Sequence, residues 1–200
     1  MWRVSDVGNV VCGKTPSTKV TEYYGDDVPF VTIPDMHGNV FATATQRKLS
    51  HAGAASQANK TLPPGTICVS CIATPGLIVV TTEESQTNQQ INSVVLREPN
   101  QTYYWFWVFR NLGDEVRAGG SGGSVLTNLS TGRFSELRVL ASTTELRRSY
   151  HSPVAALFER IRVNLRETDA LAALRDTLLP KFLSGEIRIK DVETIMEEAL

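Results

Sequence analysis

The sequence predicts an α+β fold: a globular domain with a mixed, twisted sheet, followed by one long helix able to form a coiled coil. β-Branched runs between Gly and Pro turns indicate the strands, and an aromatic-rich segment indicates a buried helix. Apolar residues spaced by threes and fours between Thr144 and Gly185 indicate the long helix. We therefore expect a domain over residues 1–141, a long helix within 142–185 and a tail over 186–200.

The strands of the domain are expected where apolar β-branched runs lie between turn residues. Two runs, Thr66–Ala73 and Leu77–Thr82, are joined by Thr74-Pro75-Gly76 and predict a hairpin. Residues 37–60 are polar, alanine-rich and weakly periodic, so a loop with one short helix is expected there. A short strand or a strand-turn is expected at Val4–Cys12, and further extended segments are expected at Pro29–Ile33, Ser93–Leu96 and Leu137–Leu140.

Two helices are expected within the domain. Pro99-Asn100 opens a helix over Gln101–Ala118, whose aromatic residues surround most of its circumference. We expect these rings to fill the core, because a stacking platform for bases presents its rings on an exposed sheet. Ser130 can cap a second, short helix that ends at Glu136.

The long helix is bounded by sequence signals at both ends. Ser142 and Glu145 predict a capping box at its start, and Pro180 followed by Ser184-Gly185 predicts its end. A helix over residues 143–179 would be roughly 55 Å long, and Pro153 should kink it. Beyond it, Asp191 can cap a final helix over Val192–Leu200.

The apolar stripe of the long helix allows two interpretations. The helix either packs on its own domain or acts as a spacer whose stripe pairs with a second helix, and we favour the second because the helix is longer than a 200-residue globule needs. The stripe comprises Leu146, Val154, Leu157, Ile161, Leu165, Leu171, Leu174, Leu178 and Phe182, of which the last seven are expected at the helix pair. An exposed stripe of this size predicts a homodimer.

Composition and charge exclude several classes of protein. The net charge is −1, and residues 1–141 hold 11 Lys/Arg and 11 Asp/Glu, whereas indiscriminate nucleic-acid binders are usually basic. A specific reader with one locally basic face remains compatible with this balance. No apolar run reaches the length of a membrane span, and no export signal is recognised, so we expect no membrane partner and a cytoplasmic location.

Catalytic and metal-binding signals are weak. Cys68 and Cys71 match a redox or zinc spacing, but they lie in a predicted strand without a second Cys pair or a nearby His, so core packing is the better interpretation. Residues 119–123 fit a hydrolase elbow, but an aromatic helix precedes them where a strand is required. We expect no catalytic residues, no metal and no cofactor bound by this chain.

Two sets of residues resemble the specificity subunits of type I restriction–modification enzymes. Ala170–Ile187 is similar to the end of the family's helix, over a long and specific stretch. Weaker matches follow in family order at Gly13–Ser17, Tyr24–Phe30, Gly65–Gly76, Thr87–Gln90, Gly120–Gly122 and Phe134–Leu137. The family's usual subunit has two target recognition domains and two antiparallel helices that set the distance between two half-sites, so this chain resembles half a subunit.

The resemblance implies a DNA-reading role without chemistry. The domain would read one part of a bipartite double-stranded site, while a separate modification subunit would bring S-adenosylmethionine and methylate adenine. A separate restriction subunit would cut DNA using ATP.

Three segments carry residue types suited to this role, because cations position a duplex and amides read base edges. The candidate residues are Lys14, Thr15, Ser17, Lys19, Asn88, Gln89, Gln90, Ser121 and Ser124. Each segment also has a structural interpretation, as a solvated turn, a strand-end cap or a helix stop. Considered together on one chain with a spacer helix, the three segments favour DNA binding. The competing class is a protein-interaction module that its helix dimerises.

Overall fold

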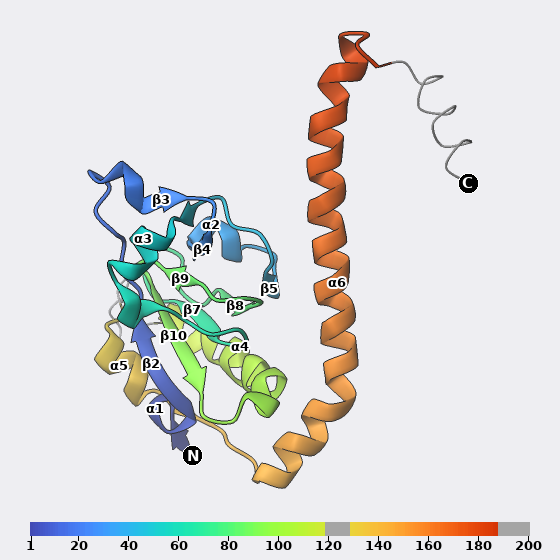
Figure 1. Cartoon of the computed structure of the whole chain (residues 1–200). Helices are drawn as coiled ribbons and strands as arrows, with labels where there is room; N and C mark the ends of the chain where they lie inside the picture. Colours follow the sequence, from blue (N-terminus) through green and yellow to red (C-terminus); the bar gives the residue numbers. More distant parts are fainter. Residues whose placement is uncertain (119–128, 188–200) are drawn as a thin grey trace. The chain divides into compact units, whose positions relative to one another are not determined.

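A computed structural model describes residues 1–118 and 129–187 of the chain (Figure 1). The chain divides into two compact units, Met1–Arg162 and Val163–Leu200, and each is considered by itself. The predicted glycine-rich turn at 119–123 and the predicted helix at 192–200 lie outside the described residues.

A five-stranded sheet forms the centre of the first unit. Its strand order is β2-β10-β7-β8-β5, with antiparallel pairing except between β5 and β8. The predicted hairpin is confirmed, since Cys68 of β7 lies opposite Val79 of β8. The strands are β2 (Gly8–Cys12), β5 (Phe41–Ala42), β7 (Ile67–Ser70), β8 (Ile78–Thr81) and β10 (Ile91–Leu96).

Two smaller sheets complete the strand pairing. One has the order β3-β6-β4-β9, with β4 and β9 parallel, and the other joins β1 to β11. A core of buried apolar residues that includes Val31, Leu62 and Ile91 packs between these strands. The strands are β1 (Trp2–Arg3), β3 (Tyr24–Gly25), β4 (Val28–Val31), β6 (Lys48–Leu49), β9 (Gln86–Thr87) and β11 (Arg138–Val139).

Short helical turns lie within two segments for which strands were predicted, one of them with a strand-turn as the alternative. The Val4–Cys12 segment begins with α1 (Val4–Val7), because the Asp6 carboxylate accepts a 2.8 Å hydrogen bond from the Arg3 amide and caps the turn. The Pro29–Ile33 segment ends at Val31, because the carboxylate of Asp35 accepts the Thr32 amide at 2.7 Å and starts α2 (Ile33–Met36).

The region 37–60 is more regular than its sequence indicates. Besides the expected short helix, α3 (His51–Ala55), it contains β5, β6 and the single turn η2 (Ala58–Lys60). Ser50 caps α3 by accepting the Gly53 amide at 3.0 Å. The two strands have two residues each, so their apolar pattern is too short to be recognised, and pairing with distant strands determines them.

The two predicted helices of the domain are confirmed. After a turn η3 (Pro99–Gln101), helix α4 (Thr102–Ala118) places Trp105, Phe106 and Phe109 in the core, while α5 (Thr131–Glu136) begins at its Ser130 cap. The expectation that the aromatic residues are largely buried is wrong for Trp107, which is 42% exposed. Figure 1 shows α4 lying alongside the five-stranded sheet.

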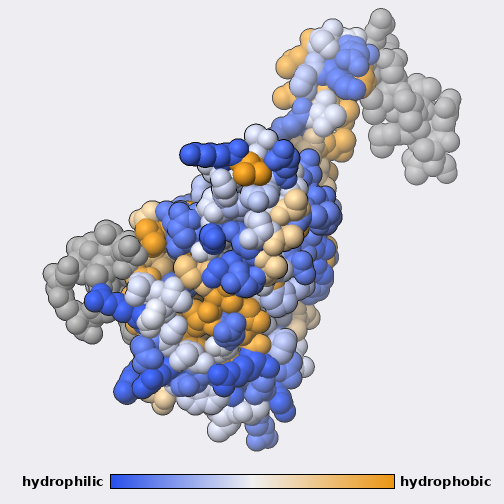
Figure 2. Space-filling model, turned by 60° about the vertical axis from the view of Figure 1, so that its left-hand side comes forward, coloured by the Kyte–Doolittle hydropathy of each residue, from blue (hydrophilic) through white to orange (hydrophobic). Residues whose placement is uncertain are grey.

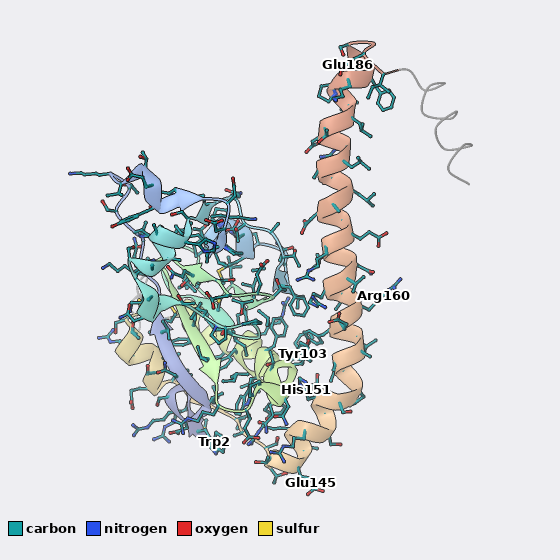
Figure 3. The ribbon with its side chains drawn as sticks, in the orientation of Figure 1. Trp2, Tyr103, Glu145, His151, Arg160 and Glu186 are labelled. Carbon is teal, nitrogen blue, oxygen red and sulfur yellow. The ribbon has the colours of Figure 1, made fainter. Side chains whose placement is uncertain are left out.

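The long helix is confirmed as α6 (Thr144–Leu183), with differences at both ends. Thr143 rather than Ser142 provides the cap, because its hydroxyl accepts the Leu146 amide at 3.3 Å. Pro180 lies inside the helix rather than ending it, and Gly185, with φ of +74°, follows the last turn. Figure 3 shows the helix bending between the labelled Glu145 and Arg160, the stretch that contains Pro153. Among the described residues, no helix combines the length and apolar character needed to cross a membrane.

The first turns of α6 pack on the domain through residues outside the predicted stripe. Arg147 and Phe158 are buried, whereas the stripe residue Leu157 is 64% exposed. Phe158 stacks on Tyr103 of α4 at 4.2 Å between ring centroids, and His151 stacks on the same tyrosine at 4.8 Å (Figure 3). The helix therefore has a domain-facing side, offset by one residue from the stripe.

Candidate nucleic-acid interface

The candidate loop after β2 is fixed against the turn between β9 and β10. The Gly13 amide donates to the Ile91 carbonyl at 3.1 Å, and the Lys14 amide donates to the Thr87 carbonyl at 2.9 Å. A Cβ atom on Gly13 would lie 2.2 Å from the Asn88 carbonyl oxygen, so glycine permits the contact. The Gly13–Val20 loop and the Thr87–Ile91 turn thus form one surface.

A pair of buried amides holds this surface from below. The Gln57 side-chain amide donates to the Lys14 carbonyl at 2.7 Å and to the side-chain oxygen of Gln86 at 2.8 Å. The Gln86 amide in turn donates to the Ala54 carbonyl and the Thr61 hydroxyl, both at 2.9 Å. Because both glutamines are buried, breaking this network would leave polar groups unpaired, and the loop backbone is held in place.

The predicted site residues of the two segments meet at one contact. The Thr15 hydroxyl donates to the side-chain oxygen of Gln89 at 2.7 Å, and Gln89 is exposed. Lys14, Ser17 and Lys19 are exposed on the same loop.

Asn88 and Gln90 use their amides within the turn. The Asn88 side-chain nitrogen donates to the Gln90 side-chain oxygen at 2.9 Å, and the Gln90 backbone amide donates back to Asn88 at 3.0 Å. These bonds match the strand-end cap considered as the structural interpretation. A base contact by either residue stays a prediction, and the predicted Ser121 and Ser124 lie outside the described residues.

A neighbouring cation was missed in the sequence. The Tyr24 hydroxyl donates to the Pro16 carbonyl at 2.9 Å, and the guanidinium carbon of Arg47 lies 4.8 Å from the centroid of the Tyr24 ring. Arg47 and Lys48 line a surface hollow of about 340 Å³ that also contains Asp26. The signal available in the sequence was the adjacent pair Arg47-Lys48 in an otherwise uncharged polar segment.

The charge of this surface is mixed. Within the described ranges, the exposed cations Lys14, Lys19 and Arg47 form no ion pair. The nearby acid Asp27 accepts the His51 backbone amide at 3.1 Å and lies 3.7 Å from the His51 ring nitrogen. The unpaired cations are available to phosphates, while the neighbouring acids keep the domain close to neutral.

The cysteines with metal-like spacing are core residues, as predicted. Burial raises the pKa of the Cys68 thiol to about 12 and that of Cys71 to about 11. Within the described part of the chain, no group of three or more His, Cys, Asp or Glu residues is arranged to hold a metal ion.

Residues 1–140 match the sequence model of the type I restriction modification DNA specificity domain. The chain belongs to this family. The specificity subunit of the type I restriction enzyme HindI from Haemophilus influenzae is 40% identical over 94% of this chain. The specificity subunit of MjaIX from Methanocaldococcus jannaschii is 25% identical over 68% of it. The chain spans 41% and 32% of the length of these two relatives.

Solved structures show the same fold. The type I restriction–modification S subunit from M. genitalium aligns with a TM-score of 0.61 and 12% identity, covering 92% of this chain and 45% of that one. The HsdS subunit from Thermoanaerobacter tengcongensis aligns with a TM-score of 0.50 and 14% identity, covering 92% and 44%. The predicted fold, an α+β domain followed by a long helix, is therefore confirmed.

The apolar stripe of this specificity chain is exposed in the second half of α6. Leu171 and Leu174 are exposed, as are Leu179 and Leu183 outside the predicted set, whereas Leu165, Leu178 and Phe182 are half-buried. Figure 2 shows hydrophobic side chains gathered along the part of the helix next to the chain end. In the first half, Leu157 and Ile161 continue the exposed set.

Proposed function

We propose that this chain reads one half of a bipartite DNA site as the specificity component of a type I restriction–modification system. The observation that carries the proposal is the rigid seating of the Gly13–Val20 loop on the Thr87–Ile91 turn, in a chain that belongs to the DNA specificity family. Reading bases requires side chains that reach base edges from fixed positions. A surface held by backbone hydrogen bonds and buried glutamines meets that requirement.

The residues of this surface divide into two roles. Lys14, Lys19 and Arg47 contact phosphates and position the duplex, since they are exposed cations without acidic partners in the described chain. Gln89 contacts a base edge, because a side-chain amide suits the paired donor and acceptor of adenine. Thr15 orients that amide through its 2.7 Å hydrogen bond, so loss of Thr15 changes sequence preference more than total affinity.

The long helix provides the second half of the site by self-association. A helix with exposed Leu157, Ile161, Leu171 and Leu174 presents a costly apolar surface to water. An antiparallel homodimer covers this surface and places one recognition surface at each end. Two-fold symmetry in the protein is mirrored in its DNA, so the preferred site has two inverted copies of one short sequence.

The chemistry belongs to partner subunits. A modification subunit binds S-adenosylmethionine, flips the target adenine and methylates it, while a restriction subunit uses ATP to cut DNA. The chain alone binds weakly, because one module buries roughly 600–1,000 Å² on DNA and a neutral domain contributes little non-specific attraction. The modification subunit adds the missing phosphate contacts.

Selection from a random-sequence duplex library tests this function. The full chain is incubated with and without the modification subunit, and bound DNA is sequenced after washing at several salt concentrations. We expect an inverted repeat at one spacing, with tighter recovery when the partner is present. A tight, continuous, non-palindromic site bound by the chain alone contradicts the half-subunit, and no enrichment under either condition favours the protein-interaction module.

A further inference from the structure

The buried arginine at the start of α6 carries an inference that rests on the proposed function. Arg147 is 1% exposed and lies in the first turns of the long helix. We propose that Arg147 is a positioning residue that holds the first turns of α6 in one direction against the domain, and that the spacing between half-sites depends on it.

Neutral groups from the domain and the helix start surround the Arg147 guanidinium. Its Nε atom donates to the Gln101 side-chain oxygen at 2.6 Å, and its terminal nitrogens donate to the Thr144 hydroxyl at 3.0 Å and to the Ser142 carbonyl. These acceptors belong to η3, to α6 and to the segment that precedes α6. The side chain therefore joins the start of the long helix to the start of α4.

Two indole rings complete the enclosure. The guanidinium carbon lies 4.7 Å from the ring centroid of Trp2 and 5.3 Å from that of Trp105. The rings themselves are 5.9 Å apart, so both contact the same cation. Trp2 belongs to β1 and Trp105 to α4, which adds a third element to the joint.

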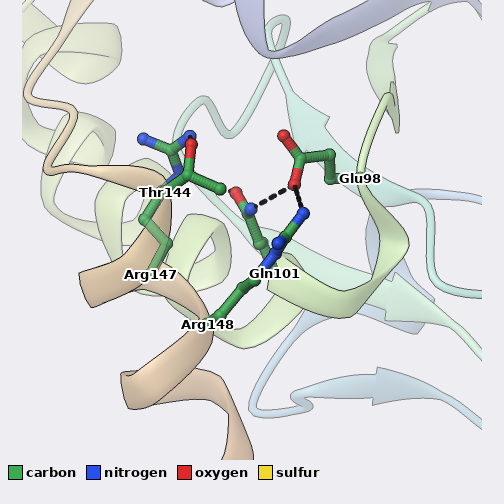
Figure 4. Close-up of polar contacts among 5 residues, drawn as sticks. All are labelled: Glu98, Gln101, Thr144, Arg147 and Arg148. Carbon is green, nitrogen blue, oxygen red and sulfur yellow. Dashed lines mark hydrogen bonds and ion pairs between the residues drawn. The ribbon is translucent and has the colours of Figure 1, made fainter.

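The nearest acid in the network, Glu98, is connected to Arg147 only through Gln101. The Gln101 side-chain nitrogen donates to the Glu98 carboxylate at 2.6 Å, and the exposed Arg148 donates to the same carboxylate at 3.1 Å (Figure 4). Since Gln101 accepts from Arg147 and donates to Glu98, a rotated amide would oppose both charges, and the orientation of Gln101 is fixed. Among the described residues, Arg147 itself forms no ion pair.

Stability alone does not explain an arginine at this position. A buried charge is desolvated, and a cation in the first turns of a helix opposes the helix dipole. An apolar side chain of similar volume would avoid both penalties. The planar guanidinium instead donates its hydrogen bonds in fixed directions, so only one arrangement of the acceptors fits it. A joint of defined direction requires such an arrangement.

A small change in direction at this joint has a large effect along a long helix. Leu183 is about 36 residues beyond Arg147, or roughly 54 Å along a helix. A tilt of about 10° would displace that end by about 9 Å, which corresponds to nearly three base-pair steps of about 3.4 Å each. Because Phe158 and His151 dock the helix at a second point, an Arg147 variant should loosen the joint without detaching the helix.

Sequence selection with Arg147→Met tests the dependence of spacing on this residue. The library carries the selected half-site in inverted pairs separated by every spacing over one helical turn of DNA. We expect the unaltered chain and the control Arg148→Met, which removes only the exposed pair with Glu98, to recover one dominant spacing. Arg147→Met should recover the same half-site sequence with at least a fivefold loss of preference for that spacing, and Arg147→Lys should give an intermediate loss.

A distance measurement tests the joint without DNA. Spin labels at Asn59 and Arg160, both exposed and both within the Met1–Arg162 unit, are measured in labelled chains diluted with unlabelled chain. We expect a narrow distance distribution that broadens in Arg147→Met and also in Trp2→Leu, which alters the half-exposed side of the enclosure and serves if Arg147→Met does not fold.

The two experiments fail separately. A folded Arg147→Met chain with an unchanged spacing preference and an unchanged distance distribution overturns the inference. If no variant selects DNA while the distances broaden as expected, the joint stands and the proposed function fails. A folded variant that loses the half-site sequence itself would place Arg147 in recognition rather than in positioning, and would also overturn the inference.

Discussion

Replacing Phe158 by alanine should destabilise the Met1–Arg162 unit strongly, whereas replacing the neighbouring Leu157 should hardly affect the stability of that unit. Phe158 is 4% exposed, and its ring lies within 6.4 Å of the rings of Tyr103, Phe106, Phe41 and Trp107. A buried phenylalanine removes about 200 Å² from water, worth about 5 kcal/mol at roughly 25 cal/mol per Å² as an upper estimate. Removing it leaves alanine and a partly collapsed cavity, so we expect a loss of about 3–5 kcal/mol.

The matched control is Leu157→Ala. Leu157 is 64% exposed, and surface substitutions of this kind change the free energy of unfolding by about 0.5 kcal/mol or less. Urea unfolding of the full chain, followed by tryptophan fluorescence at two protein concentrations, separates domain stability from self-association. For a chain of this size the Phe158→Ala loss lowers Tm by about 6–20 °C. Equal effects of the two substitutions would refute the assignment of Phe158 to the domain-facing side of α6.

The remaining predictions concern the interface, the stripe and the joint. Gly13→Ala should leave the fold intact but reduce DNA affinity at least tenfold, because its Cβ would displace the Thr87–Ile91 turn; a melting curve and a binding isotherm check both parts. Lys14→Ala should weaken binding to all DNA sequences alike and reduce the slope of log affinity against log salt concentration by about 1. Arg3→Ala removes a cation already paired with Glu136 at 2.9 Å and should leave that slope unchanged. Leu165→Asp should convert a dimer at tens of micromolar to a monomer in sedimentation, and a monomeric unaltered chain would contradict the stripe's role. Burial lowers the pKa of His151 below its ordinary 6.5. The contribution of the neutral ring to stability is therefore complete above pH 6.5 and is lost as the pH falls through the lowered pKa. His151→Phe should flatten the pH dependence of the free energy of unfolding, measured between pH 7.5 and 5.

Elements with long, consistent patterns could be predicted from the sequence. Helix α4, the β7–β8 hairpin and α6 each carry a period or a turn signal over many residues. The short strands β5 and β6 could not be predicted, because two-residue strands have no period and exist through pairing with β8, β3 and β4. The single turn α1 depends on a cap formed by Asp6, which a strand-like apolar pattern conceals.

Two residues that attach α6 to the domain, Arg147 and Phe158, could not be predicted, for different physical reasons. Phe158 follows Leu157, and both fit spacings of threes and fours, so periodicity alone cannot choose between adjacent faces of the helix. Arg147 was assigned to no role, since arginine is rarely fully buried and the acceptor that ties it to the domain, Gln101, lies 46 residues away. Burial of such a residue is a property of the folded chain and leaves no local signal.

Only the individual residues of the candidate interface could be proposed from the sequence. Their grouping could not be predicted, because strand pairing brings them together. The loop after β2 meets the turn before β10 since these two strands are neighbours in the sheet, and the sequence contains both segments without showing that they touch. Arg47 joins them through Tyr24 from a segment with no recognisable pattern. Polar loop residues could therefore be nominated individually, whereas their grouping required the fold.

The offset between the two sides of α6 lets one helix perform two tasks. Successive residues of a helix are rotated by about 100°, because 3.6 residues complete a turn. The domain-facing side, with Arg147, His151 and Phe158, is therefore rotated away from the exposed Leu157 and Ile161, while the half-buried stripe residue Val154 lies at the border of the two sides. We therefore expect that the proposed self-association through Leu157 and Ile161 leaves the helix attached to its domain and preserves the direction proposed to be set by Arg147. Under the proposed function the chain specifies both a half-site and a spacing, which requires these two contacts to be independent, and the rotation between the two sides of α6 favours that independence.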